Sequence, residues 1–417
     1  MKNKETYSPT KRFPEFYHDN WISCHLSDIG QVLNGLSGKT AEDFGKGYLY
    51  VTYKQVFNGN TINLNECERV KISPNEKQNK LFSGDILVTI TSETREDIGS
   101  VSIIDLPQIL TVYLNSFCII YRLTDKIQTP PAFILQLLQT THLRQQIKNI
   151  AQGFIRVNIS RINFLDLNIR IPSQKHECIK IAKCLSVIDT QIELQRKKIE
   201  ALKKHKHSLM QQLFPQRGQK KPSLRFSQFN KSGNWMQVHG EDLFDNISVK
   251  AGKIQLPLLA ISQEHGAIPR NDINYNVIVS DESVANYKIV TKGDFIISLR
   301  SFQGGIEYSE YDGLCSPAYV VLRKKLKLDN YFYKYYFKTS PFVHELNKNL
   351  EGIRDGKIIS YSQFSELHIP MPTLIEEQKA ISSVFRTIDQ LLELNNVKLQ
   401  CLIDHKRGLM QQLFPNN

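Results

Sequence analysis

Two segments of the chain place apolar residues at alternating spacings of four and three, the pattern of a helix with one apolar seam. The segments span 181–213 and 381–413, and eight of the ten seam positions are apolar in each. Prolines precede and follow both segments, at positions 172, 215, 372 and 415. The pattern therefore predicts two long helices of about 40 residues, each about 60 Å long.

Each seam is interrupted by two polar residues at the same places, Gln195 with Lys206 and Asn395 with Lys406. Polar groups in a seam lower stability but fix the register and the orientation of the partner. We expect the two helices to pair as an antiparallel coiled coil; the alternative is that each packs only on its own domain. The expected coiled-coil interface consists of Ile188, Ile192, Gln195, Ile199, Leu202, Ile388, Leu392, Asn395, Leu399 and Leu402.

The two helical segments belong to an internal repeat. The motif LMQQLFP ends both copies, and residues 172–215 align without a gap with residues 372–415, with 18 of 44 positions identical. Upstream, RFPEF precedes Trp21 and RFSQF precedes Trp235, and a Gly-Asp pair precedes an apolar run in each half. The segment after the first LFP resembles the start of the chain. We therefore expect a pseudo-twofold, nearly circular organisation with adjacent termini.

The regions between these repeated landmarks, about 20–170 and 235–370, contain short runs typical of strands, separated by Gly, Asn and Asp. A helical stretch follows the strands in each half, over 132–153 and 330–352, and Ser340-Pro341 is typical of a helix restart. We predict a mixed α/β fold in which two variable domains are joined by two long helices, with boundaries at 1–171, 172–215, 216–371 and 372–417.

Composition adds a preferred class of partner. The 417 residues carry 53 Lys and Arg against 41 Asp and Glu, a formal net charge of +12. This excess favours a polyanionic partner, most often nucleic acid, and on charge alone the alternative of an ordinary basic protein stays open. Seven cysteines without a regular framework indicate a reducing compartment, and no apolar run is long enough for a membrane helix. We expect a cytoplasmic protein.

Basic and polar segments follow the helical stretch in each half, GFIRVNISR at 153–161 and GIRDGKIIS at 352–360. Cationic and amide side chains beside glycine suit phosphate oxygens and guanine edges, although a solvated loop has the same composition. The candidate DNA contacts, here and elsewhere in the variable regions, are Lys54, Arg95, Arg156, Asn158, Arg161, Arg300, Gln303, Arg354 and Lys357.

Motifs that would carry chemistry are incomplete. GLSGKT at 35–40 resembles the end of a phosphate-binding loop, but Leu33 stands where the first glycine belongs. Cys178 and Cys184 have Gln378 and Val384 at the matching positions of the other copy, which argues against a metal pair. We expect no catalytic residue, metal site or cofactor in this chain.

The whole chain resembles the specificity subunit of type I restriction–modification systems. The segment IPMPTLIEEQKAISSVFRTID at 369–389 fits the family pattern closely, and the Gly-Asp motifs GDIL and GDFI match its variable domains. IRIPSQKHECIKIAKCLSVID at 169–189 fits less well, because His176 and Cys178 stand where the second copy has Glu376 and Gln378. This departure concerns the docking strength of the first helix.

The resemblance implies two target-recognition domains that each read one half of a split, asymmetric DNA sequence. It implies that the helices set the number of unread bases and dock two modification subunits, which use S-adenosylmethionine to methylate adenine. Two restriction subunits that use ATP and Mg²⁺ would complete the assembly. Two other interpretations stay open: a coiled-coil scaffold for proteins, and a stand-alone DNA-binding regulator.

Overall fold

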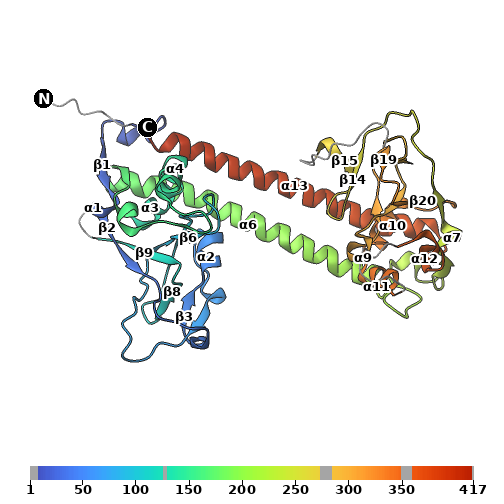
Figure 1. Cartoon of the computed structure of the whole chain (residues 1–417), viewed down its shortest axis with the longest axis horizontal. Helices are drawn as coiled ribbons and strands as arrows, with labels where there is room; N and C mark the ends of the chain where they lie inside the picture. The colour runs from blue at the N-terminus through green and yellow to red at the C-terminus, as the bar shows by residue number, and fades with distance from the viewer. Residues whose placement is uncertain (1–7, 125–128, 273–283, 349–358, 416–417) are drawn as a thin grey trace. The chain divides into compact units, whose positions relative to one another are not determined.

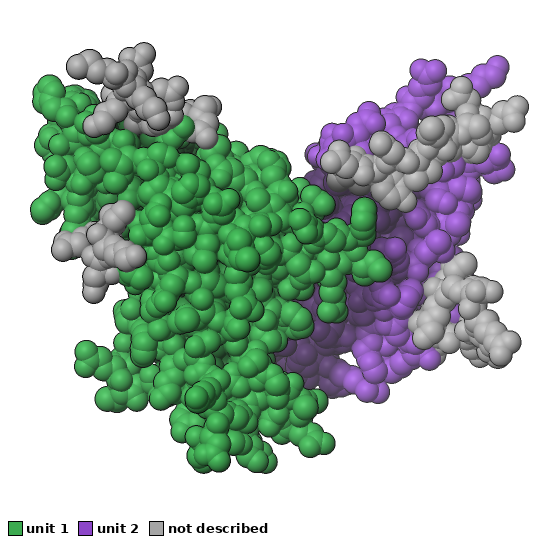
Figure 2. All heavy atoms as spheres, turned by 60° about the vertical axis from the view of Figure 1, so that its left-hand side comes forward, with its two compact units in different colours: residues 1–196, 397–417 green, residues 197–396 purple. Residues whose placement is uncertain are grey.

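The computed structural model describes residues 8–124, 129–272, 284–348 and 359–415. The chain forms two compact units, of which unit 1 is built from two separate stretches of sequence and unit 2 from one continuous stretch (Figure 2). Unit 1 comprises residues 1–196 and 397–417, and unit 2 comprises residues 197–396. Each unit therefore holds one variable region together with parts of both long helices.

Unit 1 is built on a four-stranded antiparallel sheet of order β2-β9-β5-β7, formed by Gly30–Asn34, Cys118–Leu123, Ile86–Thr89 and Val101–Ile103. A second sheet of order β4-β3-β8 is formed by Glu68–Val70, Phe44–Val51 and Val112–Leu114. Two short antiparallel pairs join β1 with β11 and β6 with β10, at Trp21–His25, Asn168–Pro172, Thr91–Ser92 and Val157–Asn158. The short helices are α1 (Leu26–Ile29), α2 (Tyr53–Asn58), α3 (Pro131–Leu138), α4 (Thr141–Ile150) and α5 (Arg161–Leu165).

Unit 2 repeats this plan with different strand lengths. Its four-stranded sheet has the order β13-β20-β17-β18, formed by Phe244–Ile247, Val320–Lys324, Phe295–Ile297 and Glu307–Tyr308. Three antiparallel pairs, β12-β21, β14-β15 and β16-β19, are formed by Met236–His239, His368–Met371, Leu259–Ser262, Gly266–Pro269, Lys288–Val290 and Gly313–Cys315. The short helices are α7 (Gly240–Leu243), α9 (Ser301–Gly304), α10 (Asn330–Tyr336), α11 (Ser340–Asn347) and α12 (Tyr361–Ser365).

The central strands carry apolar residues toward both faces, because both faces of each sheet are covered. In β5, Ile86 and Val88 enter the core shared with α3 and the long helices, whereas Leu87 enters a second core with β3 and β8. In β17, Phe295 and Ile297 face one core and Ile296 faces another. The strand-like runs of the sequence therefore mark the middle layer of each unit.

The Gly-Asp motif builds the turn that enters each central strand. Gly84 and Gly293 have φ values of 89° and 102°, the left-handed region that glycine adopts readily. The following carboxylate, Asp85 or Asp294, is 2% exposed and accepts a backbone N–H within its own turn. It also accepts two hydrogen bonds from an arginine of the neighbouring strand, Arg122 at 2.7 Å or Arg323 at 2.6 and 2.8 Å. Each motif thus locks two neighbouring strands together.

Two helices of equal length confirm the heptad prediction: α6 (Lys175–Leu213) and α13 (Ile375–Leu413), each of 39 residues (Figure 1). Within unit 1, residues 175–196 of α6 pack antiparallel against residues 397–413 of α13, since Ile181 and Leu185 share a core with Met410 and Leu413. Within unit 2, residues 197–213 of α6 meet the first half of α13 in the same way. The fold class, with its antiparallel helices and pseudo-twofold repeat, is confirmed.

The repeated LFP motif docks each helix end into a core. Phe414 lies 6.3 Å from Trp21 and 5.6 Å from Phe133, measured between ring centroids, in unit 1. In unit 2, Phe214 lies 5.2 Å from Phe332 and 5.7 Å from Phe385. The identity of the two LMQQLFP copies is thus explained by two equivalent docking sites.

One local prediction was too simple. The stretch 132–153 was expected as one helical run, but α3 ends at Leu138 and α4 begins at Thr141. The side chain of Thr140 accepts a hydrogen bond from the backbone N–H of Leu143 at 3.4 Å, a helix N-cap. The matching break in unit 2 falls before α11 at Ser340-Pro341, as its sequence indicates.

Candidate nucleic-acid interface

The expected seam lies inside the helix pair. Six of its residues are buried, namely Ile188, Ile192, Gln195, Ile199, Ile388 and Asn395. Four are half-buried, namely Leu202, Leu392, Leu399 and Leu402. Apolar residues on other faces of the helices, such as Val187 and Leu394, are more than half exposed.

An ion pair fixes the register of the helices in unit 1. Lys406, a polar exception in the seam, donates to Asp189 at 2.7 Å, and these side chains are only 12% and 15% exposed. The other acceptor sites of Asp189 receive the amide groups of Asn60 at 2.9 Å and Gln136 at 2.7 Å. Gln139 bridges Lys406 and Asn60. The carboxylate therefore joins both long helices to the variable region.

Unit 2 contains the equivalent ion pair, but a different side chain supplies the additional hydrogen bond to its carboxylate. Lys206 donates to Asp389 at 2.6 Å, and the Tyr335 hydroxyl donates to the same carboxylate at 2.7 Å. Burial, followed by the charge of Asp389, raises the pKa of Tyr335, so this hydroxyl keeps its proton. The two pairs place the N-terminal half of one helix against the C-terminal half of the other, which is the antiparallel arrangement.

A second charged pair anchors the segment that leads into each unit. Arg12 of the RFPEF segment binds Glu177 through two hydrogen bonds of 2.6 Å, and the glutamate is fully buried in the first turn of α6. Arg225 of the RFSQF segment binds Glu377 in the same way at 2.6 and 2.7 Å. In unit 2 the indole N–H of Trp235 also donates to Glu377 at 3.1 Å. The ion pairs explain the repeated Arg and Glu positions, whereas the indole bond is made by Trp235 alone, because Nε1 of Trp21 has no partner among the described residues.

Candidate DNA contacts occur in several of the segments that line one hollow in unit 1. Arg156 lines it, Lys54 follows the lining residue Tyr53 in α2, and Arg95 lies in the loop that supplies Glu93 and Asp97. Asn158 lies on β10 beside it and accepts a hydrogen bond from Thr91 at 2.8 Å. The hollow has a volume of about 340 Å³ and is lined by Tyr53, Phe57, Thr91, Ser92, Glu93, Asp97, Phe117 and Arg156.

The cations at this hollow are available for an external anion. Lys54, Arg95 and Arg156 are exposed, and within the described part of the chain their side chains form no ion pair or hydrogen bond. Nearby cations differ, because Lys148 is paired with Glu96 and Arg122 with Asp85. Unpaired, solvated cations are suited to phosphate oxygens. The aromatic lining of the hollow was not anticipated from the sequence, because Phe117, just before β9, lies far along the chain from Tyr53 and Phe57, which share α2.

The remaining candidates are spread over both units. Arg161 is exposed at the start of α5. In unit 2, Arg300 caps α9 and Gln303 lies within it, and both are exposed. Arg95 follows the short strand β6 and Arg300 follows β17, and the sequences around these two arginines do not align. Arg354 and Lys357 lie outside the described residues, and all nine DNA contacts stay predictions.

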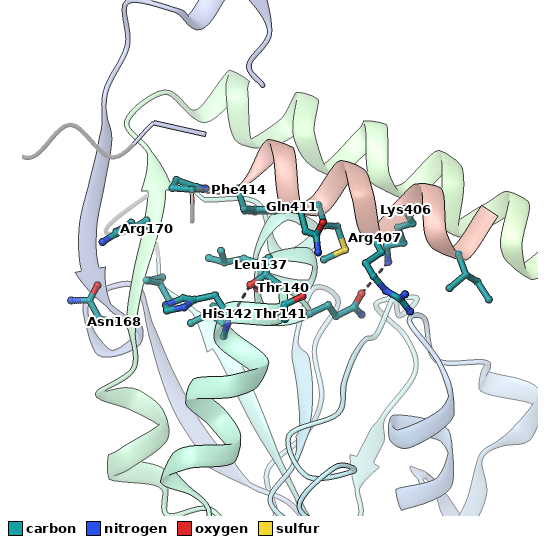
Figure 3. A pocket seen from close by; sticks show the side chains of 16 residues that line it. Leu137, Thr140, Thr141, His142, Asn168, Arg170, Lys406, Arg407, Gln411 and Phe414 are labelled. Carbon is teal, nitrogen blue, oxygen red and sulfur yellow. Dashed lines mark hydrogen bonds between the residues drawn. The ribbon is translucent and has the colours of Figure 1, made fainter. Parts of the chain in front are cut away.

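A second hollow, of about 270 Å³, lies where the end of α13 meets the corner between α3 and α4 and strand β11 (Figure 3). Lys406, Arg407 and Phe414 enter it from α13, and His142 and Arg170 face it from the other side. Burial and the charge of Arg170 lower the pKa of His142, which favours its neutral form. Because Lys406 is already bound to Asp189 and Gln139, this hollow belongs to the helix-docking site.

No group of three His, Cys, Asp or Glu side chains suited to a metal ion occurs among the described residues. Within the same residues, no helix has the length and hydropathy needed to cross a membrane.

The fold defines a class of protein in which two units with different variable regions are built on one shared pair of antiparallel helices. The family described as "Type I restriction modification DNA specificity domain" matches residues 18–204 and again residues 234–403. The chain belongs to this family, as its sequence motifs indicated. It is a type I restriction–modification specificity subunit with two specificity domains.

Two relatives come from Methanocaldococcus jannaschii. The specificity subunit of the type I restriction enzyme MjaX is 29% identical over 419 residues, covering 95% of this chain and 93% of the relative. The MjaVIII specificity subunit is 26% identical over 266 residues, covering 59% of this chain and 61% of the relative.

Solved structures show the same fold. The S subunit of a type I restriction–modification system from M. genitalium matches 98% of this chain and 100% of its own, with a TM-score of 0.58 and 16% identity. A chain from a study of complex assembly and conformational transition of the type I R-M system matches the same shares, with a TM-score of 0.55 and 16% identity.

Proposed function

We propose that each unit reads one half of a split DNA site and that α6 and α13 set the unread distance between the halves. The observation that carries this proposal is the combination of a repeated frame with unlike variable regions. The frame consists of the long helices α6 and α13 and the RFPEF and RFSQF segments. Both units use the same Asp–Lys and Arg–Glu pairs, whereas their sheets and loops differ. Two unlike readers on one frame predict an asymmetric target.

The affinity for DNA would come mainly from phosphate contacts. The net charge of +12 and the unpaired Lys54, Arg95 and Arg156 support this source. Each neutralised phosphate lowers the slope of log K against log salt concentration by about 0.9. Replacing one of these cations with alanine would therefore reduce the salt slope by about one and weaken binding to all sequences alike.

The partners expected from the family are two modification subunits, which methylate adenine with S-adenosylmethionine, and two restriction subunits, which use ATP and Mg²⁺. This chain would itself be non-catalytic and would act with them in the cytoplasm on double-stranded DNA. The exposed apolar side chains of Val187, Leu194, Leu391 and Leu394 support docking of a protein along the helices.

Methylation mapping tests the proposal directly. The chain is co-expressed with its modification subunit in a host without adenine methylation, and modified adenines are located by single-molecule sequencing. A split motif with a fixed unread gap is the expected result, and exchange of residues 20–170 should change one half of it. Formation of the complex without any split motif would refute DNA reading and favour the scaffold interpretation.

The spacer role has its own test. Removal of one heptad from each long helix shortens the pair by about 10 Å, at 1.5 Å per residue. Because base pairs in DNA rise about 3.4 Å each, the unread gap should shrink by about three base pairs. An unchanged gap in a folded, methylating complex would show that the helices do not set it.

A further inference from the structure

A tight turn beside the aromatic hollow of unit 1 exposes two large apolar side chains. Phe154 and Ile155 have relative exposures of 104% and 91%. The turn is closed by two backbone hydrogen bonds between Gln152 and Asn158, of 2.9 and 2.7 Å. Isolated exposed apolar residues are ordinary, but an adjacent pair at the tip of a closed turn indicates a surface that meets a partner.

The backbone of this turn holds the pair in place. Gly153 has a φ of 118°, and a Cβ atom at this position would lie 2.1 Å from the carbonyl oxygen of Arg156. Only glycine therefore allows the chain to turn here. The base of the turn is β10, which pairs with β6, so the tip is attached to the strand that supplies Thr91 and Ser92 to the hollow.

The hollow offers the chemistry of a nucleobase site. The rings of Tyr53 and Phe57 are stacked, with centroids 6.2 Å apart and an angle of 11° between planes, and Phe117 is 45% exposed. Every base has a π-face that can stack on such rings. Glu93 and Asp97 place carboxylates at the same hollow, and a carboxylate accepts from the exocyclic amino group of cytosine.

We propose that Phe154 and Ile155 enter the base stack of the half-site read by unit 1 and that a base released from the stack enters the hollow formed by Tyr53, Phe57 and Phe117. Apolar wedges that open a base step are an established way for proteins to deform DNA. The inference rests on the proposed function and adds to it a mode of recognition. Specificity then depends in part on how easily that step is unstacked.

Charge favours DNA over a protein partner at this turn. Arg156 follows the apolar pair directly, and Lys54 and Arg95 stand near the same hollow without an ion pair inside the described part of the chain. A wedge in DNA needs cations beside it, because phosphates flank every base step. A protein-binding apolar pair would not require three unpaired cations.

The test uses the complex of this chain with its modification subunit on the mapped DNA site. Permanganate modifies unstacked thymines and chloroacetaldehyde modifies unpaired adenines and cytosines, so every base pair is probed. The methylated adenine itself is expected to leave the stack. We expect one further reactive position, in the half-site that changes when residues 20–170 are exchanged.

The double substitution Phe154→Ala with Ile155→Ala should abolish this further reactivity. It should also weaken binding of the specific duplex by about 5-fold to about 100-fold, the effect of losing one stacked base. Ile109→Ala is the matched control, because Ile109 is 94% exposed on the same unit and lies in another loop. The control should retain the reactivity and bind within about twofold of the unmodified complex.

The outcomes separate this inference from the proposed function. A split methylation motif without a further reactive position overturns the wedge and leaves DNA reading intact. Weaker binding of the modification subunit by the double variant, with the further DNA reactivity retained once the complex is saturated, identifies the turn as a protein contact and also overturns the wedge. Absence of any split motif overturns both proposals.

Discussion

Truncation of Phe414 to alanine should release the end of α13 from unit 1. The ring is 4% exposed and packs against Trp21 and Phe133 at centroid distances of 6.3 and 5.6 Å. Replacement of a buried phenylalanine by alanine costs about 3–5 kcal/mol, since contacts are lost and a cavity remains. The substitution lies at the end of a helix, so the cost should appear as local opening of its last turns.

Hydrogen exchange measures this opening residue by residue. Because 1.4 kcal/mol corresponds to a factor of ten, a loss of about 3–5 kcal/mol predicts exchange about 150-fold to about 5000-fold faster. The affected amides are those of residues 406–413, in the helical turns that carry Lys406 and Met410 into unit 1. Amides of the central sheet, such as those of β9, should keep their protection.

Gln411→Ala provides the control, because this side chain is exposed on the same turn as Phe414. It should change exchange by less than about threefold, as expected for a surface substitution. If Phe414→Ala also left the exchange of residues 406–413 within about threefold of the unmodified protein, the LFP motif would not be a docking device. The reasoning from ring packing would then be wrong.

Three further experiments test other parts of the structure. Glu377→Gln leaves Arg225 buried without its counter-charge and should lower the free energy of unfolding of unit 2 by about 3–5 kcal/mol. Urea denaturation followed by tryptophan emission measures this loss. An unchanged midpoint would contradict the role of the pair. Burial raises the pKa of Cys178 to about 12, so only a minute fraction of this thiol is ionised at pH 8. Iodoacetamide should therefore alkylate the exposed Cys401 at least about tenfold faster than Cys178. Mass spectrometry measures the two rates. A permutant is opened within residues 216–222, and the two ends of the original sequence are joined by a short linker. It should fold and melt within a few degrees of the original chain. Failure to fold would show that the joined ends are not interchangeable with the connection at residues 216–222.

The expectation for the permutant comes from matching hydrogen bonds at the two junctions. The N–H of Lys11 donates to the carbonyl of Gln412 at 2.9 Å, and the N–H of Leu224 donates to that of Gln212 at 3.0 Å. The hydroxyls of Thr10 and Ser223 reach the same two carbonyls. Residues 10–11 therefore contact Gln412 in the same way as residues 223–224 contact Gln212.

The long helices could be predicted because their signal is periodic and local. The seam continues over several heptads, and prolines mark the limits, so α6 and α13 end two residues before Pro215 and Pro415. The strands of the middle layer were also visible, since β5, β9 and β20 coincide with apolar runs. The break between α3 and α4 was not, because Thr140 is an N-cap without a proline or glycine beside it.

The charged pairs could not be predicted from the sequence. Their aspartate, lysine and glutamate residues are identical in the two copies of the helical repeat, whereas Arg12 and Arg225 lie outside that alignment. Lys206 contacts Asp389 across 183 positions, and Lys406 contacts Asp189 across 217. A repeat shows which positions match but not which positions meet. Antiparallel pairing brings the aspartate of one copy to the lysine of the other, and this follows only once the register is known.

The candidate interface was predicted by residue type and completed by the fold. Lys54, Arg95 and Arg156 were selected as cations; the structure places Arg156 in the lining of one hollow and the other two in segments that supply lining residues. Phe154 and Ile155 lay in a segment selected for its charge, and their exposure depends on the turn at Gly153. A sequence shows that an apolar residue is present but not whether a core is available to cover it.

The frame and the variable regions contribute differently to the central ion pairs. Asp189 and Asp389 each receive a lysine from the frame, yet their remaining donors come from the variable regions and are unlike. Unit 1 supplies the amides of Asn60 and Gln136, whereas unit 2 supplies the hydroxyl of Tyr335.

The Asp189 side chain is only 15% exposed, and leaving a hydrogen bond of such a carboxylate unmade is costly, so a variable region placed on the helices of unit 1 must present a donor there. Asp389 is 36% exposed, so water can replace the Tyr335 donor in unit 2 at a lower cost. An exchanged region that brings a donor to Asp189 should assemble, whereas one with an apolar residue at the position of Gln136 should weaken both unit 1 and its helix pair.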